Sequence, residues 1–373
     1  MSGDFVIERV EARAVAVPLS QTFKGSIYEV SHRTAIVTRV TTREGLVGEG
    51  LNMVGERGLL PVVRRIVLEE IAPVIVGQPV FATERCWERM DRATDHGGRD
   101  PRAGYRAMAC ADTAIWDAVG KAVGQPLYRL WGGFRDKLPV IAIAGYHREG
   151  DEAAFGEEMI ELRALGMGGC KFKVGGDPVR DAARVRAARE AIGPDFVLCV
   201  DANRGWSRAD AVDFARRIDG LGVRWFEEPC RWRNDRRDMA DVRRAGGVPV
   251  CAGQSEGSAE ACRDLMIDGA IDVCNFDASW GGGPTVWNRV AGTAASFGVE
   301  MAHHGEPHLG AHLLAAIAGG TYMETHHPDR DPVFHGMIVD RAPFEHGTYA
   351  IPPDRPGWGI TLDADKLKAF ELA

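Results

Sequence analysis

Short apolar segments alternate with helical segments from Leu138 almost to the end of the chain, and this alternation constrains the fold most. Eight strand candidates recur at roughly 22- to 30-residue intervals: PVIAIAG, GCKFKVGG, FVLCVDAN, VRWFEEP, PVCAGQSE, AIDVCNFD, VEMAHHG and TYMETHH. Repeating strand–helix units of this length predict parallel strands joined by crossover helices. Eight such strands are the number that closes a (β/α) barrel. An open doubly wound sheet is the alternative, but the first strand lacks the Gly-rich phosphate-binding turn of that fold.

The preceding part of the chain predicts a different, α+β arrangement. FVIERVEARAVAV and RTAIVTRVTT have strand character, whereas Leu59–Glu70 and TERCWERMDRAT have helical spacing, the latter with Thr83 as candidate cap. A long apolar-patterned helix is expected to end near Gly124. We therefore predict an α/β protein with a (β/α)7β TIM-like barrel over residues 131–340. Residues 1–130 form an α+β N-terminal capping domain, and residues 341–373 return to it.

Composition excludes several classes of protein. The 373 residues suit about two domains, and 53 acidic against 45 basic residues give a formal charge of -8, which argues against a nucleic-acid partner. Every apolar stretch of membrane-spanning length contains a charge, so no membrane span is expected. The N-terminus lacks a signal-peptide pattern and the eight cysteines lack C-x-x-C spacing. These features predict a cytoplasmic protein with reduced, buried cysteines.

Polar residues end most of the predicted barrel strands. They are Lys171, Lys173, Asp201, Asn203, Glu227, Glu228, Gln254, Glu256, Asp277, His303, His304 and Glu324. In a barrel these strand ends meet at one mouth, where active sites are built. Converging acids would repel one another unless a cation were bound, and oxygen ligands favour Mg²⁺. A lysine beside the ion and a second lysine should have a lowered pKa and could act as a base.

As an ordered set, these motifs resemble the enolase superfamily, and within it the mandelate racemase subgroup with its acid-sugar dehydratases. The resemblance rests on K-x-K, VDAN, FEEP, PVCAGQ, NFD followed by GGG, HH and ME, and it covers essentially the whole chain. It implies a Mg²⁺ ion held by Asp201, Glu227 and Gln254. It also implies catalytic roles for Lys171, Lys173, Asp277, His304 and Glu324, with Asn203 lining the metal site or the substrate carboxylate.

The implied roles divide between two faces of the substrate. Lys173 would be the base on one face, while Lys171 holds the carboxylate. His304, paired with Asp277, would be the acid or base on the opposite face. Glu324 would donate a hydrogen bond to the developing enediolate.

Gln254 departs from the family pattern, which has a carboxylate there. Three interpretations stay open: the Gln254 oxygen binds the metal, Glu256 two residues on replaces it if the segment is extended, or the metal binds weakly or not at all. The adjacent histidines are a second ambiguity. Spacing favours His304 as the catalytic one and leaves His303 a structural role.

Substrate choice is expected in the capping domain. The family's mobile lid corresponds to SQTFKGSIYEVSH, where Lys24, Tyr28 and His32 are candidates for substrate binding. Arg99, Arg102 and Tyr105 form a second candidate group.

The expected activity is a hydro-lyase reaction, the Mg²⁺-dependent dehydration of a small-molecule sugar acid (aldonate or aldarate) to a 2-keto-3-deoxy acid. It would proceed by α-proton abstraction and loss of a β-hydroxyl through an enediolate. The alternatives are a racemase or epimerase of an α-hydroxy acid and a non-catalytic carboxylate-binding paralogue, with a cycloisomerase less favoured. The family suggests a homo-oligomer.

Overall fold

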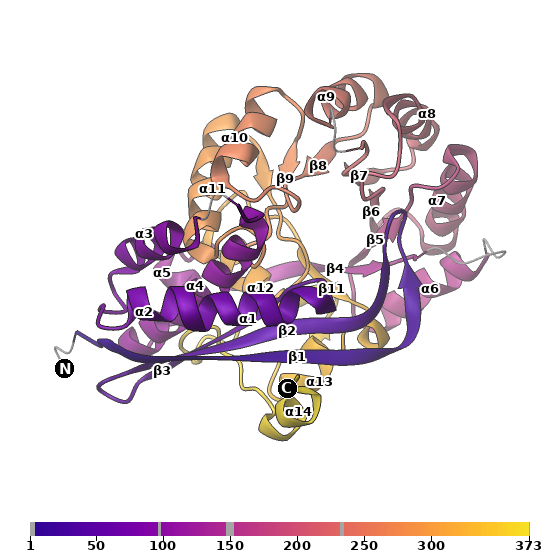
Figure 1. Ribbon diagram of the computed structural model, residues 1–373. Helices are drawn as coiled ribbons and strands as arrows, with labels where there is room; N and C mark the ends of the chain where they lie inside the picture. Colours follow the sequence, from indigo (N-terminus) through magenta and orange to yellow (C-terminus); the bar gives the residue numbers. More distant parts are fainter. Residues whose placement is uncertain (1–3, 96–97, 147–152, 232–234, 373) are drawn as a thin grey trace.

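The computed structural model describes residues 4–95, 98–146, 153–231 and 235–372, which form a capping domain beside an α/β barrel (Figure 1). In the cap, three antiparallel strands pair in the order β1-β2-β3: β1 (Ile7–Lys24), β2 (Glu29–Thr42) and β3 (Val47–Met53). The cap helices are η1 (Arg57–Leu59), α1 (Leu60–Ile66), the π-helical η2 (Val67–Ile71), α2 (Ala72–Ile75), α3 (Thr83–Thr94), α4 (Pro101–Val123) and α5 (Leu127–Leu130). Helix α4 packs on β2 and β3 and buries most of its length.

Two helices of the capping domain show how single residues determine where a helix begins or ends. Helix α4 ends where expected, because Gly124 takes the left-handed conformation (φ 66°) that a C-terminal cap needs. The expected cap of α3 was wrong. Thr83 is the first helical residue, and Ala82 occupies the cap position without a side-chain hydrogen bond.

Eight parallel strands form the barrel in the part of the chain that the structure describes. They are β4 (Lys137–Ala144), β5 (Gly169–Lys173), β6 (Val197–Asp201), β7 (Val223–Glu227), β8 (Val250–Ala252), β9 (Val273–Cys274), β10 (Glu300–Met301) and β11 (Met323–His326). The helices between them are α6 (Ala153–Ala164), α7 (Pro178–Ile192), α8 (Arg208–Ile218), α9 (Asp235–Gly246), α10 (Ala259–Ile267), α11 (Pro284–Phe297) and α12 (Pro307–Ala316). Strand β11 pairs in parallel with β4, so the sheet curls back on its first strand. This confirms the (β/α)7β barrel and excludes the open doubly wound sheet.

Strand register explains why the polar strand ends face inward. A buried apolar cluster fills the barrel interior: Ile141, Cys199, Trp225, Cys251, Val273 and Ala302. Side chains two residues apart on a strand share a face, so Asp201 and Glu227 lie above Cys199 and Trp225 on the inner side. Lys171 and Lys173 pair with Cys199 and Asp201 in the neighbouring strand and therefore face the same way.

The C-terminal segment contacts both parts of the molecule. It contains η3 (Pro328–Arg330), α13 (Pro332–Met337), β12 (Phe344–Glu345), β13 (Thr348–Ala350) and α14 (Ala364–Phe370). Strand β13 pairs antiparallel with β4, and Leu372 donates a backbone hydrogen bond to Ala14 in β1. Domain boundaries at 130 and 340 remain a prediction.

The cysteines and the helices bear on the cellular setting expected from the sequence. All eight cysteines are buried and free of disulfides, as expected. Among the described helices, none combines the length and apolar character needed to cross a membrane.

Candidate active site

Lys171 lies at the centre of a buried ion-pair cluster at the barrel mouth. Its Nζ lies 2.8 Å from Oε1 of Glu227 on β7 and 2.8 Å from Oε1 of Glu324 on β11, and all three side chains are fully buried. The indole of Trp225 donates to the second oxygen of Glu227 at 3.1 Å. The backbone N–H of Gly305 donates to Glu324 at 2.9 Å. These contacts hold two carboxylates from separate strands on one ammonium group.

Lys173 forms the second ion pair, one layer closer to the mouth. Its Nζ lies 2.6 Å from Oδ2 of Asp201. Asn203 binds the same carboxylate twice, through its backbone N–H at 2.8 Å and its side-chain amide at 3.0 Å. Asp201 is therefore held by three donors while remaining completely buried.

The expected lowering of the lysine pKa is not what these contacts produce. Burial opposes the charged form of both lysines, but the neighbouring carboxylates outweigh burial and raise the pKa of Lys171 and of Lys173. Burial also acts against Asp201, yet Lys173 and Lys171 keep the pKa of that carboxyl below its usual value. The expectation assumed carboxylates turned toward a metal ion, whereas here they contact the ammonium groups directly.

The loops that follow β6 and β7 contain strained backbone. Asn203, Arg204 and Glu228 take positive φ angles of 44°, 63° and 40°, a region that costs non-glycine residues roughly 1–3 kcal/mol each. A hydrogen bond connects the two loops, because Arg204 donates its N–H to the Glu228 carbonyl at 2.7 Å. Such strain is typical of functional sites, where the surrounding fold maintains it.

Gln254 follows β8 and lies next to Glu228. Its side-chain nitrogen donates to Oε2 of Glu228 at 2.8 Å, and its Oε1 is buried without a hydrogen-bond partner in the described chain. The expectation that Glu256 could replace it required an extended segment. Instead Gly253 has φ 144° and accepts the Glu256 N–H in a turn. Strand alternation therefore does not place Glu256 beside Gln254.

Asp277 and His304 form the expected pair. Nδ1 of His304 lies 2.8 Å from Oδ2 of Asp277, while the backbone N–H groups of Ser279 and Trp280 donate to Oδ1. Burial, with Lys171 next, lowers the pKa of His304 to about 3, and burial raises the pKa of Asp277 to about 6. The histidine is therefore neutral near pH 7, with Nδ1–H donated to Asp277 and Nε2 free of that bond.

His303 has a different environment from its neighbour. Its Nδ1 lies 3.1 Å from the Gly305 carbonyl and its Nε2 accepts the Ala278 N–H at 3.2 Å. Both ring nitrogens are thus used by the backbone, which agrees with the structural role expected from sequence.

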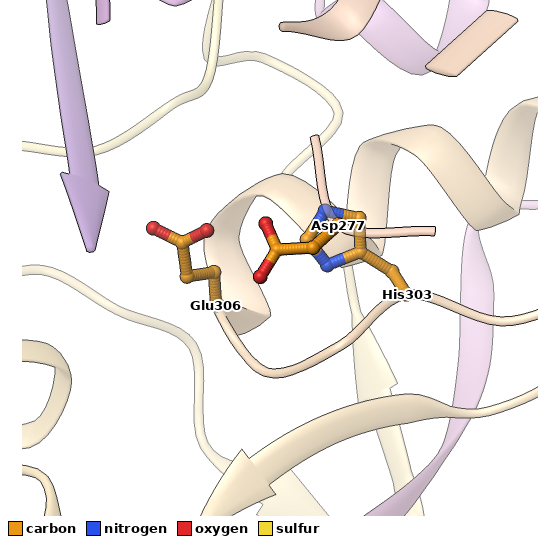
Figure 2. Close-up of side chains that lie close together, drawn as sticks. All are labelled: Asp277, His303 and Glu306. Carbon is orange, nitrogen blue, oxygen red and sulfur yellow. The ribbon is translucent and has the colours of Figure 1, made fainter. Parts of the chain in front are cut away.

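A second group of potential metal ligands lies beside the Asp277–His304 pair. The sequence analysis did not predict this group. Asp277, His303 and Glu306 offer ligand atoms within 4.8 Å of one another, and Figure 2 shows the Asp277 carboxylate directed toward that of Glu306. Because the nitrogens of His303 and both oxygens of Asp277 already have partners, this cluster suits a buried polar contact better than a metal ion. Glu306 also accepts the N–H of Met53, so it joins the cap to the barrel.

The cap supplies a wall for the His304 side of the site. The Trp280 ring packs 4.9 Å from the His304 ring, and its indole donates to the Met53 carbonyl at 3.2 Å. The Arg106 guanidinium of α4 lies 5.0 Å above the Trp280 ring. Sequence reasoning missed Arg106, Trp280 and Glu306 because none lies at a strand end of the motif set.

The lid hairpin between β1 and β2 reaches the lysine side, and its far end bends toward β5 and β6 in Figure 1. Ser26 donates to the Ala202 carbonyl at 2.6 Å. A side chain at Gly175 (φ 118°) would collide with Ser26, so glycine is needed there. The Tyr28 ring lies 5.9 Å from Lys173 Nζ, and burial raises the pKa of its phenol.

Lys24, Arg99 and His32 have partners outside this cluster among the described contacts. Lys24 pairs with Glu29 at 3.1 Å, with 63% of its side chain exposed. Arg99 pairs with Glu70 at 2.9 Å, while His32 contacts Ser31 at 3.0 Å. Substrate contacts by these residues remain predictions. Tyr146, which the sequence did not single out, faces Lys173 at the same 5.9 Å as Tyr28.

The residues present at the mouth fit a hard divalent cation. Asp201 and Glu227 supply carboxylates, and Asn203 Oδ1 and Gln254 Oε1 are buried acceptors without partners among the described residues. Buried acceptors normally have a partner, and an all-oxygen ligand set is what magnesium prefers.

Comparison with known proteins shows which family this geometry belongs to. Residues 8–132 match the mandelate racemase / muconate lactonizing enzyme N-terminal domain, and residues 154–366 match the enolase C-terminal domain-like model. The chain therefore belongs to the mandelate racemase / muconate lactonizing enzyme family of the enolase superfamily.

Curated relatives within this family differ in reaction. The arabinonate dehydratase of Saccharolobus solfataricus is 28% identical over 88% of each chain. The D-galactarolactone cycloisomerase of Agrobacterium fabrum is 28% identical over 95% of this chain and 96% of its own. The L-Ala-D/L-Glu epimerase of Bacillus subtilis is 25% identical with coverage of 95% and 96%. Family membership thus defines shared chemistry without selecting one reaction.

Solved structures agree with the fold over the full length. A mandelate racemase/muconate lactonizing enzyme superposes with a TM-score of 0.95 at 49% identity, covering 99% of this chain and 100% of its own. A second, from a marine actinobacterium in complex with magnesium, gives 0.93 at 48% identity with 99% coverage of each chain.

Proposed function

We propose that this protein is a Mg²⁺-dependent sugar-acid dehydratase that converts an aldonate or aldarate to a 2-keto-3-deoxy acid. The observation that carries the proposal is the pair of proton-transfer groups at the mouth. Lys173 Nζ lies 2.6 Å from Oδ2 of Asp201, and Nδ1 of His304 lies 2.8 Å from Oδ2 of Asp277, which leaves Nε2 of His304 available as a proton acceptor. One group can release a proton while the other accepts one, which is what elimination of water requires.

The contacts of the two groups suggest a division of roles that reverses the expectation from sequence, because Asp277 lies on Nδ1 of His304 and Lys173 Nζ lies against Asp201. Nε2 of His304 accepts the α-proton, and Asp277 stabilises the imidazolium that results. Lys173 donates a proton to the β-hydroxyl as the carbon–oxygen bond breaks, so that it leaves as water. The enol product then becomes the 2-keto-3-deoxy acid by tautomerisation.

The negative charge of the reaction intermediate would be stabilised by the buried cluster around Lys171. Loss of the α-proton next to a carboxylate makes a dianionic enediolate, which Lys171 would stabilise by its charge and a protonated Glu324 by donating a hydrogen bond. Asp201, Glu227 and Gln254 would hold the magnesium ion, which supplies positive charge to the substrate carboxylate when bound. The magnesium-bound relative and the dehydratase relatives support this assignment.

A library of aldonates and aldarates incubated with Mg²⁺ tests the proposal, with semicarbazide to trap keto products and NMR in D₂O to follow the α-proton. A trapped product is the expected result. Absence of both product and deuterium incorporation across the library would overturn the enzymatic assignment and leave the carboxylate-binding paralogue.

Epimerisation is the second candidate, because proton-transfer groups on two faces could also return the α-proton from the opposite side, and an epimerase is among the relatives. Deuterium at the α-carbon without keto product for every acid sugar tested would favour it. We further expect a homo-oligomer, which light scattering of the purified protein would test.

A further inference from the structure

Gln254 is a neutral residue at a proposed metal-ligand position, so the orientation of its side-chain amide matters. A carboxylate presents oxygen on both sides, whereas an amide presents oxygen on one side and nitrogen on the other. An amide can serve a cation only if something turns its oxygen toward the ion. A glutamine at this position therefore needs a neighbouring residue that orients its amide, whereas a glutamate would not.

Glu228 is the group that meets this need. It lies directly after the proposed ligand Glu227, and its carboxylate accepts the Gln254 amide nitrogen at 2.8 Å. An ionised carboxylate can only accept hydrogen bonds, so with Glu228 ionised beside Arg204 the amide nitrogen faces Glu228 and Oε1 faces away. Oε1 is then left buried without a hydrogen-bond partner among the described residues.

The surroundings hold this contact in place. The Gln254 side chain is 4% exposed and that of Glu228 3%. Asn275 accepts the Gln254 backbone N–H at 3.1 Å, and Arg204 Nε lies 3.7 Å from the same Glu228 oxygen. Glu228 is held by its left-handed backbone and by its N–H bond to Cys251.

We propose that Glu228 is a positioning residue that fixes the Gln254 amide with its oxygen presented to Mg²⁺, and that the two residues act as one unit. Substitution at one position therefore has an effect that depends on the other. The inference rests on the proposed function for the identity of the ion, but it concerns binding and not turnover.

The sharpest test exchanges the two side chains. Gln254→Glu alone places two carboxylates where a 2.8 Å hydrogen bond was, and adjacent like charges disfavour ionisation. Its affinity for Mg²⁺ should not exceed that of the wild type. The double variant E228Q/Q254E keeps the net charge and the hydrogen bond but moves the carboxylate to the ligand position, so it should bind Mg²⁺ about tenfold more tightly than Q254E.

Two single variants complete the experiment. Glu228→Gln can pair with Gln254 in either amide orientation, and Mg²⁺ affinity should fall about tenfold, as for other groups that orient metal ligands. Gln254→Ala should cause a similar loss, and adding E228Q to it should change nothing further. Glu256→Gln is the matched control, since it removes a nearby acid that has no hydrogen bond to Gln254 among the described contacts; affinity should stay within about twofold of wild type.

Isothermal titration of Mg²⁺ without substrate, with thermal melting to verify folding, gives the readout. Three outcomes would each overturn the proposal. The first is equal Mg²⁺ affinity in Q254E and in E228Q/Q254E, and the second is a loss of Mg²⁺ affinity in E256Q but not in E228Q. The third is no Mg²⁺ binding by the folded wild type. If E228Q or the exchanged pair does not fold, Q254E binding tighter than wild type would overturn it. Since no reaction is measured, failure of the dehydratase assignment would leave this binding pattern intact.

Discussion

The two sides of the barrel mouth handle charge in opposite ways. On the lysine side, two ammonium groups contact Asp201, Glu227 and Glu324 directly, so buried charges are paired. On the histidine side, burial behind Trp280 and the cap keeps His304 neutral and raises the pKa of Asp277 to about 6. The lysine side depends on its ion-pair partners, whereas at His304, whose side chain is 21% exposed, partial burial outweighs the contact with Asp277. The two sides should therefore respond differently to substitution and to pH.

Removal of either proton-transfer group should have the largest effect and would test which side supplies the base. His304→Asn should slow α-proton exchange and dehydration by about 10²–10⁴-fold. Lys173→Met should slow dehydration by a similar factor while α-proton exchange persists. NMR in D₂O on the substrate found by library screening measures both. If α-proton exchange persists in His304→Asn but is lost in Lys173→Met, Lys173 is the base and the proposed roles are wrong.

Loss of a paired charge should appear as lost stability on the lysine side. Lys171→Met leaves Glu227 and Glu324 buried without their ammonium partner, and such a change costs about 3–5 kcal/mol. Urea unfolding without added Mg²⁺ measures it. Lys24→Met is the control, since its pair with Glu29 is exposed and should contribute within about 0.5 kcal/mol. Similar losses in both variants would contradict the comparison.

Acid should destabilise the histidine side first. Burial lowers the pKa of six histidines: that of His303 and His308 to about 4, that of His304, His312 and His326 to about 3, and that of His335 below its usual value. These residues stay neutral in the folded protein while the unfolded chain binds protons below about pH 6.5. Stability should therefore fall as pH decreases from about 6.5 toward 4, by up to about 1.4 kcal/mol per pH unit for each histidine.

His312→Gln isolates one of these contributions outside the proposed site. His312 accepts the Tyr128 N–H at 3.3 Å, and its Nε2 lies 3.2 Å from the Trp358 carbonyl. Urea unfolding at several pH values should show a shallower acid slope than in the wild type. An unchanged slope would mean that burial does not control this titration. Asp112, whose pKa burial raises to about 7, acts in the opposite direction, because its folded form keeps a proton that the unfolded chain releases.

The smallest effect should come from the cap wall. Arg106→Met removes the guanidinium over Trp280, a contact of about 1 kcal/mol, or roughly fivefold in rate. The α-proton exchange assigned to His304 should slow by that factor, while Mg²⁺ affinity on the lysine side stays unchanged. Equal losses in exchange and affinity would show that the cap acts on the whole mouth.

Much of this organisation could be predicted from the chain alone because it depends on local periodicity. The strand–helix repeat predicted the barrel, and the positions of Lys171, Asp201 and Glu227 at strand ends predicted that they meet at its mouth. His304 was separated from His303 by spacing, and the structure brings His304 to Asp277. Arg106 and Glu306 were not predictable, because they reach the site from the cap and from a loop kink, without periodic signals.

The sequence by itself determined the fold class, the order of the polar strand ends and the anomaly at Gln254. Only the tertiary structure decided the partners of the lysines and of His304, and with them the direction of each pKa shift, because a pKa depends on burial and on groups brought from distant strands. It also decided that Gln254 contacts Glu228 and that a turn at Gly253 takes the place of the extended segment that the Glu256 alternative required. Those outcomes follow from the left-handed kink at Glu228 and the turn at Gly253, since backbone direction after a strand end decides where the next side chains point.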